Sequence, residues 1–447
     1  MDFLDKLVIP LSPEHIILLH YIAMLILILF VPFISIILGG TVISLYYRGK
    51  GIKEGNNNYI RFAKDVIEIV TINKSIGIML GIMPLITAIL IFVQIFHNEN
   101  LIVVSYFTAA CVLVIAGLIF IYTYRYSLTF NDIFDSIRNF NTGNPSVENE
   151  IVRFRSGSLK VSIKSGRFGI LFLIIGLWLF ISGLTLALFQ SDWNDSGIFT
   201  VMFSWKVIAR FISFLLTAGA FTGAAILFSF FYWDGGIKGL EQEYSNFVRK
   251  FSIILISVTS GIIPVFLFIN VGTLPENTLT GNVFAYVTIA LLLLFLVYHY
   301  LYIMYKNSGT KYSLHIFVSV LLTICAVIIS DQTAIAEANA KQSLILSQNF
   351  EDVMQKINEA NTPVVINGVD IYNNICSACH SFDHKVVGPP YIQTLPKYHG
   401  DVDKLVTFIL NPKQNNPGYP PMPNPGLNAL QARAVATYIL KEVQKYK

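Results

Sequence analysis

Long apolar runs constrain this chain more than any other feature of its sequence. Residues 16–45 and 168–188 contain no Lys, Arg, Asp or Glu. Each run is about as long as, or longer than, the roughly 20 residues that a helix needs to cross a bilayer. Charged residues make up only 13% of the chain, against roughly 25% in an average soluble domain. A single soluble globule is therefore excluded, and a polytopic membrane protein is indicated.

Apolar windows along the chain predict an all-α, polytopic transmembrane helical bundle of about eight spans. The predicted spans are residues 16–46, 70–96, 101–123, 168–190, 199–232, 251–272, 282–305 and 312–331.

The distribution of Lys and Arg between these spans predicts their orientation. The connections 97–100, 190–197 and 271–281 contain neither residue. The alternate connections are basic and should be cytoplasmic. With eight spans, both termini would then lie in the periplasm of a bacterium, with the chain in its inner (cytoplasmic) membrane. No cleaved signal peptide is expected, because the first apolar run is long and is followed by positive charge. The basic connections carry Arg48, Lys50, Lys53, Arg61 and Lys64, then Arg125, Arg138, Arg153, Arg155, Lys160, Lys164 and Arg167, and later Lys238, Arg249, Lys250, Lys306 and Lys311.

Composition changes abruptly to polar and small residues from Ser330 onward. This change divides the chain into a transmembrane domain (1–332), a helical linker (333–363) and a soluble domain (364–447). The linker would either lie against the membrane or a partner, or act as a solvated spacer. The last domain is small for an independent core, so a cofactor filling its centre would make physical sense. The formal net charge of +4 gives no reason to expect a nucleic-acid partner. The apolar linker residues at helical spacing are Leu346, Phe350, Val353, Met354 and Ile357.

The sequence Cys376-Ser377-Ala378-Cys379-His380 is a C-x-x-C-H motif. Two thiols three residues apart on a helical turn can each add to a vinyl group of a porphyrin, and the next imidazole is then delivered to the iron. The motif therefore predicts one covalent haem c. A zinc-binding pair or a chance match is the alternative.

A haem iron that transfers electrons needs a second axial ligand, and a methionine raises its reduction potential. Met422 is the only methionine after the motif, and it lies in the proline-rich segment 418–423. It is therefore the predicted sixth ligand, unless it is a surface hydrophobe. His384 and His399 are the competing candidates, with surface histidine as their alternative interpretation.

Residues 364–447 resemble a class I (mono-haem) cytochrome c domain of the small bacterial type. The resemblance rests on Gly368–Tyr372 before the motif, Gly388–Tyr391 after it, and a predicted terminal helix at 430–443. It implies thioether bonds at Cys376 and Cys379, with His380 and Met422 as the axial ligands of the metal. It also implies that the carbonyl of Pro389 accepts a hydrogen bond from His380, which would orient the imidazole. Haem of this type is attached outside the cytoplasmic membrane, the side that the loop charges predict.

Histidines that could bind a membrane haem are few and poorly placed. His15 and His20 belong to one end of the first span, whereas His299 and His315 belong to the opposite leaflet. His15 and His20 also point about 140° apart on a helix that turns roughly 100° per residue. A dihaem cytochrome b arrangement is therefore poorly supported.

The N-terminal part is similar to the large subunit of cytochrome bd-type quinol oxidases. The similar stretches are Ala23–Met24, Phe30–Pro32, Asn73–Gly77, Gly81, Phe211 and Thr222–Gly223. On this alignment the family's haem histidines fall on Leu27 and on Phe214 or Ser213, so both ligands are lost. Acidic residues of the third span are absent, and the quinol-handling loop is reduced to about ten residues after Val271.

These patterns leave three functions open. In the first, the chain is an electron-transfer subunit of a cytochrome bd-like oxidase, passing electrons between a periplasmic donor and the haems of a sister membrane subunit. The second is the cytochrome c subunit of a quinol:cytochrome c oxidoreductase, and the third is a tethered redox sensor or anchor. Lys206 and Arg210, one turn apart in the fifth span, should either face a partner, a propionate or water, or reach the interface along their stems.

Overall fold

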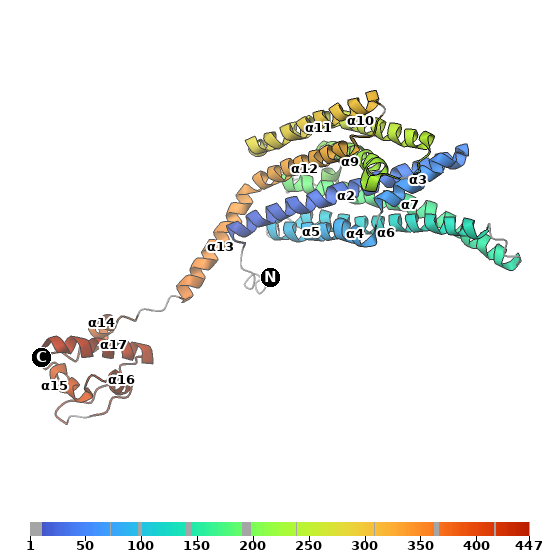
Figure 1. Ribbon diagram of the computed structural model, residues 1–447. Helices are drawn as coiled ribbons and strands as arrows, with labels where there is room; N and C mark the ends of the chain where they lie inside the picture. Colours follow the sequence, from blue (N-terminus) through green and yellow to red (C-terminus); the bar gives the residue numbers. More distant parts are fainter. Residues whose placement is uncertain are drawn as a thin grey trace. The chain divides into compact units, whose positions relative to one another are not determined.

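The computed structural model describes residues 11–71, 73–96, 101–138, 145–189, 198–237, 239–307, 309–361, 366–414 and 417–446, and within them it contains helices and no strand. The chain forms two compact units, Met1–Val353 and Met354–Lys447. Figure 1 shows the long helices of the first unit and the short helices of the second. The predicted all-α fold is confirmed.

Eight helical segments of the first unit are long and apolar enough to cross a membrane. This confirms the eight predicted spans and a multi-pass membrane protein. Within a bilayer a helix satisfies all of its own backbone hydrogen bonds, so apolar runs of this length fold as helices. The segments are α2 (Pro13–Glu54), α4–η1–α5 (Lys74–Phe96), α6 (Leu101–Arg138), α7 (Pro145–Leu188), α9 (Trp205–Phe231), α10 (Gln242–Gly272), α11 (Gly281–Asn307) and α12 (Ser313–Ala338).

Several helices continue beyond the predicted spans, because an apolar window measures only the part of a helix that lipid requires. Helix α6 continues past residue 123 to Arg138, and α7 begins at Pro145 rather than at 168. These extensions are polar but helical, and most of the basic connection between the two spans therefore belongs to helices. The two helices lie side by side, as Figure 1 shows. A Cβ on Gly117 of α6 would lie 2.8 Å from a methyl group of Leu173 on α7, so the glycine permits this close approach.

The segment predicted as one span at 199–232 is divided. A short helix α8 (Ile198–Met202) precedes α9, and Ser204 separates them. The Ser204 side chain accepts a hydrogen bond from the backbone N–H of Val207 at 3.4 Å and so begins the new helix. N-capping by serine is a local signal that apolarity does not report.

Helix α3 (Asn57–Val70) was not predicted. It lies between α2 and the second span and buries Phe62, Ala63, Val66, Ile67 and Val70 along one face. The Phe62 ring lies 5.1 to 5.2 Å from the rings of Tyr47, Phe247 and Phe251, which come from α2 and α10. This aromatic cluster fixes α3 at the end of the bundle that carries the basic residues.

Helix α2 is central in the bundle and contacts α3, α5, α9 and α12. It crosses α9 closely, where the Thr222 hydroxyl donates a hydrogen bond to the Ser35 carbonyl at 3.1 Å. A Cβ on Gly39 would lie 2.2 Å from the Thr222 hydroxyl oxygen. Small residues at such a crossing allow the backbones to approach within a membrane.

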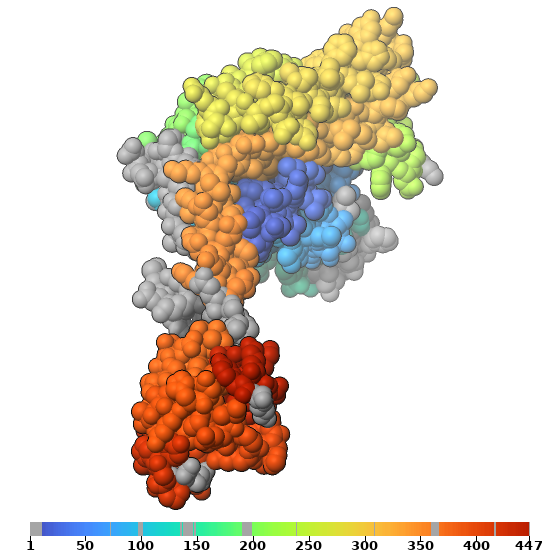
Figure 2. Space-filling view, turned by 90° about the vertical axis from the view of Figure 1, so that its left-hand side faces the viewer, coloured from blue at the N-terminus to red at the C-terminus, as the bar shows by residue number. Residues whose placement is uncertain are grey.

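Helices α10 and α11 form one outer face of the first unit, shown in yellow-green to yellow-orange in Figure 2. Only 33% of the apolar window of each helix is buried. Large apolar side chains such as Phe268 and Phe295 are exposed there, by 63% and 75%. This face is therefore suited to lipid or to another membrane subunit.

The second unit consists of short helices around a small core. The helices are α14 (Gly368–Ile371), η5 (Tyr372–Cys376), α15 (Tyr391–Thr394), η6 (Leu395–Tyr398), α16 (Val402–Leu410), α17 (Ala429–Glu442) and η7 (Val443–Tyr446). Helix α13 (Ala340–Asn361) covers most of the predicted linker, and the boundary between the two compact units lies within it. The core of the second unit includes Tyr372, Phe382, Leu405, Val435 and Ile439.

Candidate functional site

The C-x-x-C-H motif begins at Cys376, the last residue of η5. The Ser377 N–H donates to the Tyr372 carbonyl at 2.8 Å, and the N–H groups of Cys379 and His380 both donate to the Cys376 carbonyl, at 3.1 and 2.9 Å. Both cysteines are free and half-buried. Burial raises the pKa of the Cys376 thiol, which keeps that sulfur protonated near neutral pH. These five consecutive residues therefore present two thiols and one imidazole together.

The His380 ring is held from two sides. Its Nδ1 lies 3.0 Å from the carbonyl oxygen of Pro389. The ring of Tyr391 stacks on it at a centroid distance of 5.1 Å and an interplanar angle of 14°. Because Nδ1 is engaged with a carbonyl, the other ring nitrogen, Nε2, is the one left with a free lone pair for a ligand.

Gly388 makes this position of His380 possible. A Cβ added to Gly388 would lie 2.3 Å from Cε1 of His380 and 2.8 Å from its Nδ1. The Gly388 N–H also donates to the Cys379 carbonyl at 2.8 Å. The loop therefore closes over the face of the imidazole only because no side chain is present.

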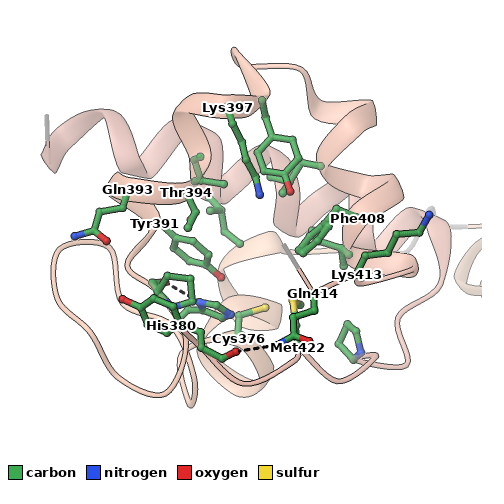
Figure 3. A pocket seen from close by; sticks show the side chains of 18 of the residues that line it. Cys376, His380, Tyr391, Gln393, Thr394, Lys397, Phe408, Lys413, Gln414 and Met422 are labelled. Atoms are coloured by element: carbon green, nitrogen blue, oxygen red, sulfur yellow. Dashed lines mark hydrogen bonds between the residues drawn. The ribbon is translucent and has the colours of Figure 1, made fainter. Parts of the chain in front are cut away.

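Met422 shares a cavity with these residues. A cavity of about 290 Å³ is lined by Cys376, His380, Pro389 and Met422 together with mainly apolar and aromatic side chains. A smaller adjoining cavity of about 150 Å³ is lined by Cys379 as well. Figure 3 shows the side chains of His380, Cys376 and Met422 in this pocket. The structure thus brings all five predicted site residues around one space.

The Met422 loop is fixed at its far end. The Asn424 side-chain amide donates to the carbonyl of Leu410, the last residue of α16, at 3.1 Å. Pro420, Pro421 and Pro423 restrict the backbone on both sides of the methionine. The thioether is therefore presented by a stiffened segment.

His384 and His399 do not reach the cavity. The His384 side chain is 71% exposed, and its Nδ1 lies 2.7 Å from an Asp383 carboxylate oxygen. His399 is exposed and has a left-handed backbone with φ of 49°. Neither histidine lines the space that Met422 faces.

The residues around this space fit a haem. The lining offers two thiols for covalent attachment, one oriented imidazole, one thioether and an apolar wall. A zinc ion usually takes four protein ligands at a structural site. Among the described residues no group of three or more His, Cys, Asp or Glu side chains could hold such an ion.

Several pocket residues were not identified from the sequence. Tyr391 stacks on the imidazole, and Leu405, Phe408 and Ile409 of α16 form an apolar wall. Burial is the main cause that raises the pKa of Tyr391 well above its usual value, so its hydroxyl stays protonated. Only the position of Tyr391, two residues after Pro389, was a signal in the sequence.

The membrane unit has a cavity of its own where the oxidase resemblance would place haem ligands. Leu27, Ser213 and Phe214 line a cavity of about 110 Å³ together with Arg210 and Asp331. No His, Cys or Met is among its described lining residues. The cavity is also much smaller than the one beside His380. These residues do not fit a haem b.

Arg210 is buried in the bundle rather than extended to the interface. It is 8% exposed, and its Nη1 lies 3.4 Å from Oδ1 of Asp331 on α12. Lys206, one turn earlier, lies over the ring of Phe189 at 3.8 Å. Arg210 therefore faces an acidic partner, which was one of the two interpretations of this cation, and does not reach the interface along its stem.

The comparisons with known proteins concern a small part of the chain. Cytochrome c-551 of Allochromatium vinosum is 38% identical over 69 residues, which cover 14% of this chain and 73% of that protein. No protein-family model matches the chain, and no solved structure matches it. The match supports a cytochrome c electron-transfer domain and implies haem c as its cofactor.

Proposed function

This chain belongs to the cytochrome c family through its haem-binding domain, and on that premise we propose that it is the membrane-anchored c-type cytochrome subunit of a respiratory complex related to cytochrome bd oxidases. It passes electrons between a periplasmic donor and haems held by a sister membrane subunit. The observation that carries the electron-transfer role is the shared cavity of His380 and Met422 beside the two motif cysteines.

In this proposal the thiols of Cys376 and Cys379 would hold the haem through thioether bonds, and Nε2 of His380 and the sulfur of Met422 would bind its iron. Haem c supplies a one-electron iron centre. Pro389 holds the imidazole in position and makes it a stronger donor by accepting the Nδ1 proton in a hydrogen bond. Met422 favours the reduced state, as a methionine ligand does in cytochromes c.

The membrane unit supports the proposal of a sister subunit. Among the described residues that line its cavity at Leu27 and Phe214 there is no His, Cys or Met, so we assign the catalytic haems to another chain. The outer face of α10 and α11 exposes large apolar side chains, and a membrane subunit would cover part of it. The loop charges support a periplasmic position for the haem c domain.

Two spectra of the purified complex test these assignments: the pyridine haemochrome identifies the haem types, and the visible spectrum of the native reduced complex with and without CO shows whether any haem b is high-spin. Haem c with haem b and either haem d or additional high-spin haem b supports an oxidase. Haem c with low-spin haem b and reduction by quinol supports a quinol:cytochrome c oxidoreductase instead. Haem c alone, in a complex with no other cofactor, supports a sensor or anchor.

A deletion of residues 364–447 tests whether electrons from the donor pass through the haem c domain. Donor-linked turnover should be lost, whereas chemical reduction of the membrane haems should be unchanged. A Met422→Leu variant keeps the domain and serves as the matched control for assembly. Unchanged donor-linked turnover in the deleted complex would refute the proposed role.

A further inference from the structure

The cavity of the membrane unit has polar groups at one end and apolar walls at the other. Arg210 of α9, Asp331 of α12 and Asn270 of α10 line it near the end of the bundle where α9 begins and α10 and α12 finish. Seven residues further into the bundle on the same helices, the lining is Thr217 and Ile324. At a rise of about 1.5 Å per residue the cavity is therefore about 10 Å deep.

Arg210 carries hydrogen-bond donors that no described residue uses. Its Nη1 faces Asp331 at 3.4 Å, which is long for a charge-assisted bond. Its Nε and Nη2 are buried and have no hydrogen-bond partner among the described residues, and the same holds for Oδ1 of Asn270. Buried polar groups without partners are rare in native structures and call for an explanation.

The two free donors of Arg210 lie on one edge of the guanidinium group. An edge of two N–H groups matches two oxygens of a carboxylate or a phosphate, which bind it side by side. A carbonyl oxygen carries no charge and would occupy only one of these donors well. The free edge therefore favours an anionic head with two oxygens.

We propose that this cavity binds a membrane amphiphile, with the carboxylate or phosphate of its head on the Nε–Nη2 edge of Arg210 and its acyl chain along the apolar wall. The wall is built by Leu27 and Phe30 of α2, Phe180 of α7 and Ile324 of α12. The volume of about 110 Å³, against about 290 Å³ beside His380, admits a chain rather than a macrocycle. Arg210 lies five residues inside α9, about 8 Å along the helix from its start, so the head would lie toward that end of the bundle.

Photo-crosslinking of the full chain in detergent tests this proposal. Two probes are used in separate arms, a diazirine-bearing palmitate and a diazirine-bearing phosphatidylglycerol. We expect saturable labelling of peptides from α2, α9 and α12 in one arm, which identifies a fatty acid or a phospholipid as the source of the anionic head. Labelling confined to the exposed face of α10 and α11, or no saturable labelling in either arm, would overturn the proposal.

Substitutions at two similar arginines separate recognition from packing. Arg210→Met should reduce the saturable labelling by at least about tenfold, the equivalent of one charge-assisted hydrogen bond. Arg249→Met is the matched control, because Arg249 is also 8% exposed in a membrane helix but does not line the cavity. Equal losses in both variants would show a general packing effect and contradict the proposal.

A second variant covers the case in which Arg210→Met does not fold. Leu27→Trp fills the apolar part of the cavity and leaves Arg210 in place, so labelling should be lost while the charge remains. Competition supplies an independent outcome. If a neutral short-chain quinone displaces the probe as well as unlabelled palmitate does, the site does not select an anionic head, and the proposal is wrong.

Discussion

Replacing Gly388 by alanine should change the redox behaviour of the C-terminal domain without unfolding it. The new Cβ would lie 2.3 Å from Cε1 of His380, whereas ordinary contact begins at 3.4 Å. The imidazole and the Gly388 backbone must therefore move apart by about 1.1 Å. A shift of that size breaks the contact of 3.0 Å between Nδ1 and the Pro389 carbonyl. Gly388 does not have a positive φ, so the effect comes from the contact and not from backbone strain.

The size of the effect follows from the lost hydrogen bond. Such a bond is worth about 0.5 to 1.5 kcal/mol. It makes the imidazole a stronger donor and so stabilises the oxidised iron. If the whole loss falls on the oxidised state, the reduction potential rises by about 20 to 65 mV, since a tenfold change in a one-electron equilibrium is about 59 mV.

A spectroelectrochemical titration of the purified chain measures this shift. The long-wavelength sulfur-to-iron absorption band should persist, because Met422 lies on a different loop. Val386→Ala is the matched control, since Val386 is on the same loop and 41% exposed but lines neither cavity. A potential that is equal in the Gly388→Ala variant and the native chain, or an equal shift in the control, would refute this account of the His380 position.

Three further predictions follow from individual contacts. Met422→Leu should lower the reduction potential and abolish the sulfur-to-iron band, and a persisting band in the visible spectrum would exclude Met422 as a ligand. Asp401→Ala removes the N-cap of α16. At neutral pH it should lower the guanidinium chloride concentration at which half of the domain is unfolded, as followed by loss of the sulfur-to-iron band. A backbone N–H holds the pKa of Asp401 below its ordinary value of 3.8, so its stabilisation is present above that pH and is lost as the pH falls through the lowered pKa. The unfolding midpoints of the native chain and of the Asp401→Ala variant should therefore converge in acid. A difference that stays constant with pH would contradict a stabilising charge on Asp401. Gly39→Val should destabilise the bundle by about 1 to 3 kcal/mol through overpacking against Thr222, whereas Gly49→Ala on the same helix meets no atom within 4 Å and should not lower the thermal unfolding temperature.

The sequence was sufficient for the membrane spans because their cause is simple. A run such as 168–188 has no charge, and only a helix can place its backbone in lipid. Apolarity predicts no helix outside lipid, where α6 continues as a polar helix to Arg138 and α7 begins as one at Pro145. It also misses α3, whose Phe62 is buried by aromatic rings of α2 and α10 that are distant in sequence.

The candidate site was predictable where residues are neighbours in the chain. Cys376, Cys379 and His380 lie within five positions, and their spacing alone indicates their chemistry. The stacking of Tyr391 on the imidazole and the α16 wall depend on tertiary packing, which no spacing reports. In the membrane unit, Arg210 was an anomaly of the sequence, but its contact with Asp331 joins residues 121 positions apart.

Helix α17 completes the core of the C-terminal unit, and its place late in the chain means that it is made after the motif at 376–380. Gly368 packs against α17 so closely that a Cβ would lie 2.2 Å from the Ala434 carbonyl oxygen, and the ring of Tyr446 stacks on Phe382 at 5.2 Å. Protein chains are made from the N-terminus, so the motif at 376–380 leaves the ribosome before the residues that close this core. For that interval the two thiols are carried by a segment that cannot yet complete its fold. Closure of this core by α17 is therefore a separate step that comes later than synthesis of the motif.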